Sequence, residues 1–331
     1  MRALVTGGGG FLGGVIVRML RERGDQVRSF SRAGYPALSK PGVEQVRGDL
    51  GDQVAVIEAA QECDMIFHVA AKAGIWGSYS DFYQANVTGT ANVLEACRAN
   101  GIGRLVYTSS PSVVFDGGDV EGGDESLPYP PSYEAHYPET KAMAEKLVLA
   151  ANSPQLATVA LRPHLIWGPG DNHLVPRILA KGKAGKLRRI GQRPNLVDTV
   201  YVDNAARAHL QAADHLAPGR PPAGKAYFIS NGQPLPLWEM INRILAAADI
   251  PPVTGSIPPE LAYAAGCICE GIWGLLRLGG EPPMTRFVAH ELASAHWFDI
   301  SAARRDFGYN PEVSIDEGLV RLRQWLQRTR F

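Results

Sequence analysis

The sequence predicts an α/β protein built on a doubly wound parallel sheet, and three observations lead to this fold class. β-rich runs alternate with amphipathic helical patterns through the first half of the chain, as in successive β-α-β units. The runs are almost continuously apolar, which is typical of strands buried on both faces of a parallel sheet. A glycine cluster, "TGGGGFLGG", separates the first run from the first helical pattern. This combination is typical of a Rossmann fold.

Each element of the first half is expected from its own local pattern. The strand patterns are short, apolar and bounded by turn residues, whereas the helical patterns repeat apolar residues at three- and four-residue spacing. The expected strands are 3–6, 27–31, 43–47, 65–69, 105–109 and 158–161. The expected helices include 53–62, 81–100 and 140–151.

Past residue 163 the chain changes character, because Gly and Pro become frequent and short strands mix with helices. We expect residues 1–163, with returning segments near 191–229, to form the Rossmann domain. Residues 164–331 would form a smaller, partly interleaved C-terminal substrate domain, mixed α/β and mostly helical at its end. The strand patterns there are 187–190, 197–202 and 226–229, and the helical patterns include 204–216, 237–248 and 315–327.

The composition argues against several classes of protein. The 331 residues include 33 Lys and Arg and 33 Asp and Glu, so no general attraction to nucleic acid is expected. The basic stretch 181–189 is interpreted as a solvated helix end. The four cysteines match neither a zinc site nor a disulfide framework, which predicts reduced thiols, a cytoplasmic protein and no metal. No secretory leader is recognised, and the apolar segment 261–280, interrupted by Glu270 and Arg277, is a poor membrane span.

The glycine cluster can be read in two registers. Gly8-x-Gly10-x-x-Gly13 is the six-residue dinucleotide fingerprint, and Gly7-x-x-Gly10-x-x-Gly13 has one more residue in the turn. In either register a strand turns sharply into a helix, so that the free N–H groups and dipole of the helix N-terminus face a pyrophosphate. We therefore predict a bound dinucleotide, the alternative being a plain tight turn.

The end of the second strand predicts which dinucleotide binds. A site that prefers NAD usually places Asp or Glu there, about 20 residues beyond the glycines, to hold the ribose hydroxyls. Here Ser31 is followed by Arg32. A hydroxyl and a guanidinium can bind the 2′-phosphate that a carboxylate would repel. The expected cofactor is NADP(H), and the alternative is a solvated arginine.

The sequence "YPETK" places Tyr137 and Lys141 four residues apart, hence on one face of a helix. An ammonium group near a phenol favours phenolate and lowers the pKa of the tyrosine. Tyr137 would then exchange a proton near neutral pH. The pair follows a strand that ends in hydroxyl residues, "LVYTSSPS", and it begins a long helical pattern.

Taken in order, these motifs resemble the extended branch of the short-chain dehydrogenase/reductase superfamily. The stretches "HVAAKAG" (68–74), "NVTGTANVLEAC" (86–97) and "LRPHLIWGPGD" (161–171) reinforce the resemblance, which covers nearly the whole first half. It implies cofactor contacts at Gly7, Gly10, Phe11, Leu12, Gly13, Ser31, Arg32, Asp49, Leu50, Ala70, Ala71, Lys72, Thr108, Tyr137, Lys141 and Pro163.

The same resemblance implies a catalytic group of Tyr137, Lys141 and Ser110. In the superfamily, a Ser or Thr after the preceding strand holds the substrate oxygen beside the tyrosine. An alignment of "TSS" without gaps selects Ser110. Ser112 is the alternative, because Pro111 makes the local register uncertain.

Within the extended branch, the chain resembles the 3β-hydroxysteroid dehydrogenase group. The stretches "AAKAGIWGSYSDFYQANVTGT", "GKAYFISNG" and "ARRDFGYNP" are similar to bacterial reductases of 2-alkyl-3-oxo fatty acids in long-chain olefin biosynthesis. This implies NADPH-dependent reduction of a lipid-like β-keto acid to a β-hydroxy acid. A decarboxylating sterol-4-carboxylate 3-dehydrogenase is the alternative. A nucleotide-sugar epimerase and a non-enzymatic NADPH sensor are weaker alternatives.

Such a substrate needs an apolar pocket and a partner for its carboxylate. The apolar residues 261–278, interpreted as a pair of helices, would either line a tunnel or pack against the sheet. The resemblance also implies a homodimer through helices 81–100 and 136–151, and association with other enzymes of an olefin pathway. The candidate substrate contacts are Lys72, Trp76, Ser112, Asn172 and His173.

Overall fold

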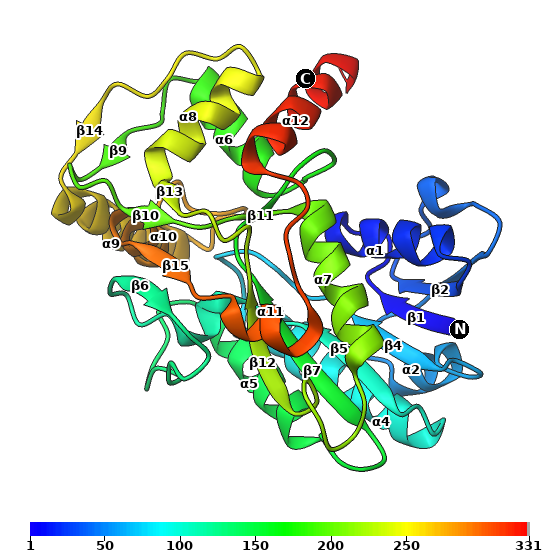
Figure 1. The fold of residues 1–331 in the computed structure, drawn as a ribbon. Helices are drawn as coiled ribbons and strands as arrows, with labels where there is room; N and C mark the ends of the chain where they lie inside the picture. The colour runs from blue at the N-terminus through cyan, green and yellow to red at the C-terminus, as the bar shows by residue number, and fades with distance from the viewer. Residues whose placement is uncertain (330–331) are drawn as a thin grey trace.

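The computed structural model describes residues 1–329 and confirms the predicted α/β fold (Figure 1). The central strands are β1 (Arg2–Thr6), β2 (Gln26–Ser31), β3 (Val43–Arg47), β4 (Met65–His68), β5 (Arg104–Thr108), β7 (Ala157–Pro163) and β12 (Lys225–Ile229). They form one sheet in the order β12-β7-β5-β4-β1-β2-β3, and all neighbours are parallel. The chain order reverses between β1 and β4, which is where ligands bind in sheets of this kind.

Helices cover both faces of this sheet, as the doubly wound prediction requires (Figure 1). On one face, α1 (Phe11–Glu22) packs against α7 (Val202–His215). On the other, α2 (Gln53–Ala59), α4 (Gly89–Ala99) and α5 (His136–Ala150) lie side by side. Each layer has its own apolar core, with Ile16 in the first and Val148 in the second. The chain therefore buries apolar residues on both faces of the strands.

The helical pattern 81–100 forms a continuous helix with one irregular turn. It consists of α3 (Tyr79–Tyr83), a π-helical turn (Gln84–Thr88) and α4. The side chain of Asn86, in the wide turn, is buried and bonded to the backbone of Lys72. Wide turns of this kind often occur at functional sites because they displace a side chain from the regular helical spacing.

The second half adds smaller elements beside the sheet. Its predicted strand 197–202 is broken, because Asp198 and Thr199 turn their side chains inward to His164 and Trp167. The remaining strands are β6 (Val120–Gly123), β8 (Ile166–Trp167), β9 (Arg189–Ile190), β10 (Leu196–Val197), β11 (Val200–Tyr201), β13 (Leu235–Pro236), β14 (Ser256–Ile257) and β15 (His296–Phe298). The remaining helices are α6 (Leu174–Lys183), α8 (Leu237–Ala247), α9 (Pro259–Leu276), α10 (Arg286–Ala293), α11 (Ser301–Phe307) and α12 (Ile315–Thr329), with 3-10 turns at Pro36–Leu38 and Pro111–Val114.

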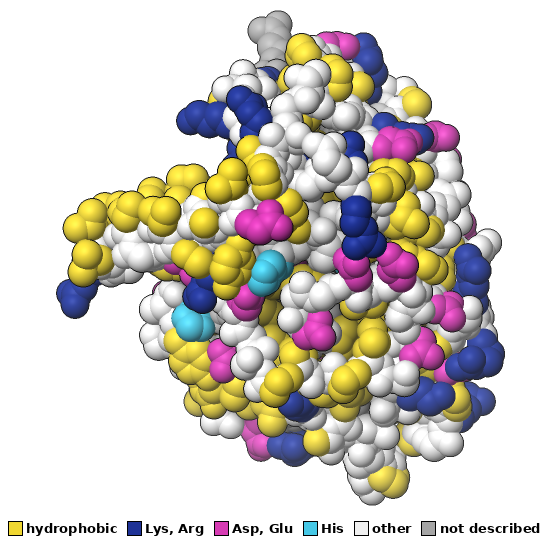
Figure 2. All heavy atoms as spheres, turned by 90° about the vertical axis from the view of Figure 1, so that its left-hand side faces the viewer, with side chains coloured by type: hydrophobic (Ala, Val, Ile, Leu, Met, Phe, Trp, Pro, Cys, Tyr) yellow, Lys and Arg dark blue, Asp and Glu magenta, His cyan; other side chains and the backbone are white. Residues whose placement is uncertain are grey.

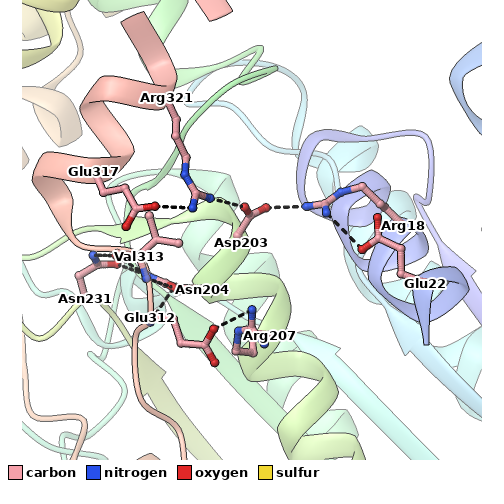
Figure 3. A network of polar contacts seen from close by, with 10 residues as sticks. All are labelled: Arg18, Glu22, Asp203, Asn204, Arg207, Asn231, Glu312, Val313, Glu317 and Arg321. Atoms are coloured by element: carbon pink, nitrogen blue, oxygen red, sulfur yellow. Dashed lines mark hydrogen bonds and ion pairs between the residues drawn. The ribbon is translucent and has the colours of Figure 1, made fainter. Parts of the chain in front are cut away.

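A polar network holds the C-terminal segment against the first half of the chain (Figure 3). Asp203 on α7 bonds to Arg18 of α1 at 2.7 Å and to Arg321 of α12 at 3.3 Å. The buried amide of Asn204 accepts a hydrogen bond from the Val313 N–H at 3.0 Å and donates one to the Val313 carbonyl at 2.8 Å. Helix α7 therefore forms part of the helical layer that covers the central sheet, and it also anchors the end of the chain.

The apolar segment 261–278 differs from its prediction. It forms one helix, α9, rather than a pair, and only Ala262 and Gly266 of that helix are buried. The interpretation as core packed against the sheet is wrong, because Leu275 is 83% exposed. Leu276 is exposed as well, so neither leucine lines a closed tunnel. Within residues 1–329, no helix is both long and apolar enough to cross a membrane.

Candidate active site

The glycine turn adopts the longer of the two registers. Gly7 has φ +72°, a left-handed backbone conformation that favours glycine, and its carbonyl accepts a hydrogen bond from the Gly10 N–H at 2.8 Å. A Cβ atom on Gly13 would lie 2.2 Å from the same carbonyl oxygen. Gly10 is the N-cap of α1 and provides no side-chain cap, so the first N–H groups of the helix, including those of Phe11 and Leu12, are available to an anion.

A buried chain of hydrogen bonds ties this turn to the π-helical turn. The hydroxyl of Thr90 donates to the Asn86 carbonyl at 2.6 Å and accepts from Nε2 of His68 at 2.9 Å. Nδ1 of His68 then accepts from the Thr6 hydroxyl at 2.8 Å. Burial, with a smaller effect of Lys141, lowers the pKa of His68 to about 3, which fits the neutral imidazole that this order requires. These hydrogen bonds thus fix the position of the glycine turn relative to the π-helical turn.

The end of β2 carries polar groups suited to a phosphate. The hydroxyl oxygen of Ser31 is buried and has no hydrogen-bond partner within the described chain. Arg32 is exposed beside it. The guanidinium of Arg47, at the end of β3, lies against Gly34, so a second cation is close to this corner. Arg47 is not among the predicted site residues, although its position at the end of the neighbouring strand is a usable signal.

Two further predicted cofactor contacts follow β3. The exposed carboxylate of Asp49 accepts a hydrogen bond from the Gly51 N–H at 2.8 Å. The carbonyl of Leu50 accepts one from the Asn92 side chain at 2.7 Å, which fixes the loop against α4.

The ring of Tyr35 lies over Gly9, where an added Cβ would be 2.1 Å from the ring. Tyr35 thus covers the glycine turn, a contact that the sequence gives no means of predicting.

Tyr137 and Lys141 lie on α5 as predicted, in the turns that face β5. The helix begins at His136, within the expected range 136–151, so Tyr137 is in its first turn. The ammonium of Lys141 is buried; it donates to the Thr108 carbonyl at 2.6 Å and lies 4.2 Å from the centre of the Tyr107 ring. Burial lowers the pKa of Lys141 to about 7.

The pKa of Tyr137 differs from the expectation. It is raised, because desolvation of the hydroxyl outweighs a favourable interaction with the hydroxyl of Ser110. The expected lowering by Lys141 is not seen, since that ammonium is bonded to the Thr108 carbonyl. The Thr108 hydroxyl itself bonds to Nε2 of His209 at 2.8 Å, on α7.

The structure favours Ser110 over Ser112 as the partner of Tyr137. Ser110 lies at the end of β5 and caps the 3-10 turn that begins at Pro111, accepting the Ser112 N–H at 3.2 Å. The two serine hydroxyls bond to each other at 2.8 Å. Ser110 is also the serine that influences the pKa of Tyr137.

A buried ion pair fixes α5, the helix that carries Tyr137 and Lys141. Glu145, one turn beyond Lys141, binds Arg162 through two hydrogen bonds of 3.0 and 2.6 Å. Both side chains are almost fully buried, at 0% and 3% exposure. Arg162 precedes Pro163, so the pair ties α5 to the end of β7. Neither residue is among the predicted site residues, although Glu145 continues the four-residue spacing of Tyr137 and Lys141.

Residues from the C-terminal part also reach the site. The carboxyl of Glu291 on α10 interacts electrostatically with Tyr137 and raises the pKa of that tyrosine. Burial raises the pKa of Glu291 itself to about 7. Beside it, buried His164 bonds to Asp198 at 2.6 Å and to His296 at 3.1 Å. No local motif marks these residues, because they meet only when β7, β10 and β15 come together.

The remaining candidate contacts are placed less directly. The backbone N–H of Lys72 donates to Asn86 at 2.7 Å, but its ammonium is already paired with Asp81 at 3.0 Å, so it is not a free cation for a substrate. Asn172 and His173 are exposed before α6, and no hydrogen bond within residues 1–329 joins either side chain to the catalytic group. Ala70 packs against Gly7, Ala71 is exposed, Trp76 is partly buried in the following loop, and Pro163 is buried at the end of β7.

Comparison with known proteins identifies the family. A family model described as the 3-beta hydroxysteroid dehydrogenase/isomerase family matches residues 4–254, well over half of the chain. The chain belongs to this family. The match covers both the glycine turn and the Tyr137–Lys141 helix, and it confirms the resemblance to extended short-chain dehydrogenases/reductases.

Relatives within and around this family cover nearly all of the chain. A 2-alkyl-3-oxoalkanoate reductase of Stenotrophomonas maltophilia is 57% identical over 98% of each chain. A protein of the same name from Shewanella oneidensis is 51% identical over 97% of this chain and 85% of its own. A decarboxylating sterol-4-alpha-carboxylate 3-dehydrogenase of Mus musculus is 35% identical over 97% and 89%. The chain is therefore an oxidoreductase of alcohol or ketone groups.

Solved structures share the fold. The dTDP-glucose 4,6-dehydratase DesIV of Streptomyces venezuelae, a double mutant with NAD and DAU bound, superimposes with a TM-score of 0.77 at 25% identity, covering 100% of this chain and 98% of its own. The epimerase Mth375 of Methanothermobacter thermautotrophicus gives 0.79 at 22% identity over 99% and 93%, which concerns the fold alone. These matches confirm the doubly wound α/β fold of the chain.

Proposed function

We propose that the protein reduces 2-alkyl-3-oxoalkanoic acids to 2-alkyl-3-hydroxyalkanoic acids with NADPH. The observation that carries the proposal is the 57% identity, over 98% of both chains, to a reductase named for this substrate. A second reductase of that name is 51% identical. The sterol dehydrogenase is more distant, at 35%. The proposal includes a role in long-chain olefin biosynthesis beside other enzymes of that pathway.

The catalytic group can carry out this reaction at the ketone oxygen. When bound, NADPH supplies the hydride for the ketone carbon. Tyr137, whose raised pKa keeps its phenol protonated at neutral pH, donates a proton to the oxygen as negative charge develops there. The Ser110 hydroxyl donates a hydrogen bond to the same oxygen. Lys141, whose ammonium is held at the Thr108 carbonyl, would bind the nicotinamide ribose.

The cofactor is proposed to be NADPH rather than NADH. A Cβ added at Gly7 or Gly13 would clash with neighbouring backbone atoms, so the turn excludes side chains at these positions, and its free N–H groups suit a pyrophosphate. The Ser31 hydroxyl is buried and has no hydrogen-bond partner within residues 1–329; together with the cations of Arg32 and Arg47 it suits a 2′-phosphate. No carboxylate follows Ser31 to repel that phosphate.

We also propose a homodimer through the helices that carry the site. Tyr79 and Tyr83 on α3 and Leu147 on α5 are large apolar side chains exposed on this face. These helices pack against one another, so their exposed residues form one surface. Sedimentation equilibrium would test the stoichiometry, with Leu147→Glu expected to give a monomer.

The proposed activity can be tested by following NADPH absorbance with a 2-alkyl-3-oxo fatty acid, a 4-carboxysterol in the reverse direction with NADP, and a UDP-sugar. We expect turnover on the fatty acid and a kcat/KM for NADPH well above that for NADH. In Arg32→Ala the preference for NADPH should fall by about tenfold, the effect of one exposed charge-assisted contact. Turnover on the sterol or the sugar alone would refute the proposed substrate, and an unchanged ratio in Arg32→Ala would refute the role of that residue.

A further inference from the structure

Helix α9 is an apolar arm that projects from the protein surface. Leu261, Ile268 and Leu275 lie on one line at seven-residue spacing and are 61%, 62% and 83% exposed. From residue 271 to the end of the helix only Trp273 is partly buried. Figure 2 shows this arm at mid-height on the left, with hydrophobic side chains along it and a basic side chain at its end.

The exposed apolar surface is too wide for the usual contact of one helix with another. At 3.6 residues per turn, the exposed positions of α9 cover more than half of its circumference. A helix that packs on one partner needs an apolar stripe of about 100°. Its charged residues are Glu260 in the first turn and Glu270 on the inner side. An arm of this kind suits a hydrocarbon phase, which contacts every exposed face.

The base of the arm is held firmly. Gly266 packs against the backbone of Thr285 and Arg286, where an added Cβ would lie within 2.7 Å. Glu270 accepts hydrogen bonds from the Arg286 N–H at 2.8 Å and from its guanidinium at 2.7 Å. Both contacts fix α9 on α10, the helix that carries Glu291 toward Tyr137. The arm therefore has a set direction relative to the active site.

A basic segment lies beside this base. Residues 177–193 contain seven of the 33 Lys and Arg and none of the 33 Asp and Glu. Strand β9 within it pairs with β14, directly before α9, and Lys181 donates to the Pro283 carbonyl after α9 at 3.3 Å. Lys183 and Lys186 are exposed and have no carboxylate partner within residues 1–329. The sequence alone suggests a solvated helix end here, but the fold puts this charge beside the apolar arm.

We propose that α9 inserts into the interfacial layer of a lipid bilayer containing anionic lipids, while the basic segment 177–193 lies against the headgroups. Helices in this position bury apolar side chains at the boundary between headgroups and acyl chains. Lys and Arg near an anionic surface add to the attraction, which salt weakens. The helix need not cross the bilayer. The inference is independent of which ketone the enzyme reduces.

The test is co-sedimentation of the full-length protein with vesicles of phosphatidylcholine alone or with 30% phosphatidylglycerol. We expect binding to the anionic vesicles and at least tenfold weaker partitioning of the triple variant Ile268→Gln, Ile272→Gln, Leu275→Gln. The matched control, Val54→Gln with Val320→Gln, removes two apolar side chains exposed elsewhere and should bind as wild type does. Lys183→Gln with Lys186→Gln should weaken binding to the anionic vesicles and reduce its dependence on salt.

Two results would overturn the proposal. One is wild-type protein that binds vesicles no better than the triple variant. The other is a change of oligomeric state in the triple variant by sedimentation equilibrium, without a change in vesicle binding, since the arm would then be covered by a second copy of the chain. All the substituted residues are exposed, so the melting temperatures of the variants should match that of the wild-type protein.

Discussion

Two adjacent glycines at the start of α1 give a sharp test of the proposed cofactor turn. A Cβ on Gly13 would lie 2.2 Å from the Gly7 carbonyl oxygen and 2.8 Å from its carbon. A Cβ on Gly14 would meet only the Gly8 carbonyl oxygen, at 3.5 Å. The distance for Gly13 is far shorter than a van der Waals contact, whereas the distance for Gly14 is an ordinary contact. Substitution by Ala should therefore lower the stability of the protein at position 13 and raise it at position 14.

The expected magnitudes follow from these distances. Relief of the Gly13→Ala contact requires the turn to open by about 1 Å, given that unstrained heavy-atom contacts begin above about 3 Å. Misplacement of a binding group by 1 Å costs on the order of 100-fold, and overpacking costs about 1–3 kcal/mol of stability. Gly14→Ala should instead stabilise the protein, by up to about 1 kcal/mol, because Ala favours the helix.

The assays are titration of NADPH by its fluorescence and unfolding in urea. Gly13→Ala should raise the Kd for NADPH about 100-fold or more, while Gly14→Ala should leave it within about threefold of the wild-type value. NADPH binding by Gly13→Ala at wild-type affinity would show that the pyrophosphate does not lie in this turn. An equal loss in both variants would show that helix α1, rather than the close approach at Gly7, controls binding.

Three other substitutions test the catalytic helix and its support. Tyr137→Phe should lower kcat by roughly 10²–10⁴-fold with an unchanged NADPH Kd, and near wild-type turnover would refute its role as proton donor. Glu145→Gln leaves Arg162 buried without its counter-charge and should cost about 3–5 kcal/mol in urea unfolding, whereas exposed Glu139→Gln should cost no more than about 0.5 kcal/mol. Glu291, with a pKa of about 7, is ionised at higher pH and then raises the pKa of Tyr137. Glu291→Gln should lower that pKa, so the fall of kcat/KM at high pH should begin at lower pH than in the wild type; an unshifted profile would contradict the interaction.

Local patterns in the sequence predicted most of the central sheet. Buried parallel strands are continuous apolar runs, so the expected strand 43–47 matches β3 and the others differ by one or two residues at their ends. The Tyr137–Lys141 spacing likewise predicted a shared helix face. Such features depend on residues close together in the chain, where backbone geometry fixes which side chains lie side by side.

Tertiary packing alone determined which groups surround Tyr137 and Lys141. Lys141 was expected beside the phenol of Tyr137, yet its ammonium bonds to Thr108, because the end of β5 passes over this helix. Glu291 comes to the site from 154 residues beyond Tyr137. No local pattern records such contacts, since they depend on how distant segments meet.

The apolar helix α9 shows the same limit most clearly. Its composition alone fits a buried core, a tunnel wall or an exposed arm, because hydrophobicity states a preference for leaving water and does not specify what covers the side chains. Only the fold shows that Leu275 is exposed and that a basic segment lies at the base of the helix. The sequence by itself determined the fold class, the glycine turn between the first strand and helix, and the shared helix face of Tyr137 and Lys141, which carry the proposed function. The tertiary structure decided which charges, hydroxyls and apolar surfaces act together, since distances between remote residues exist only after folding.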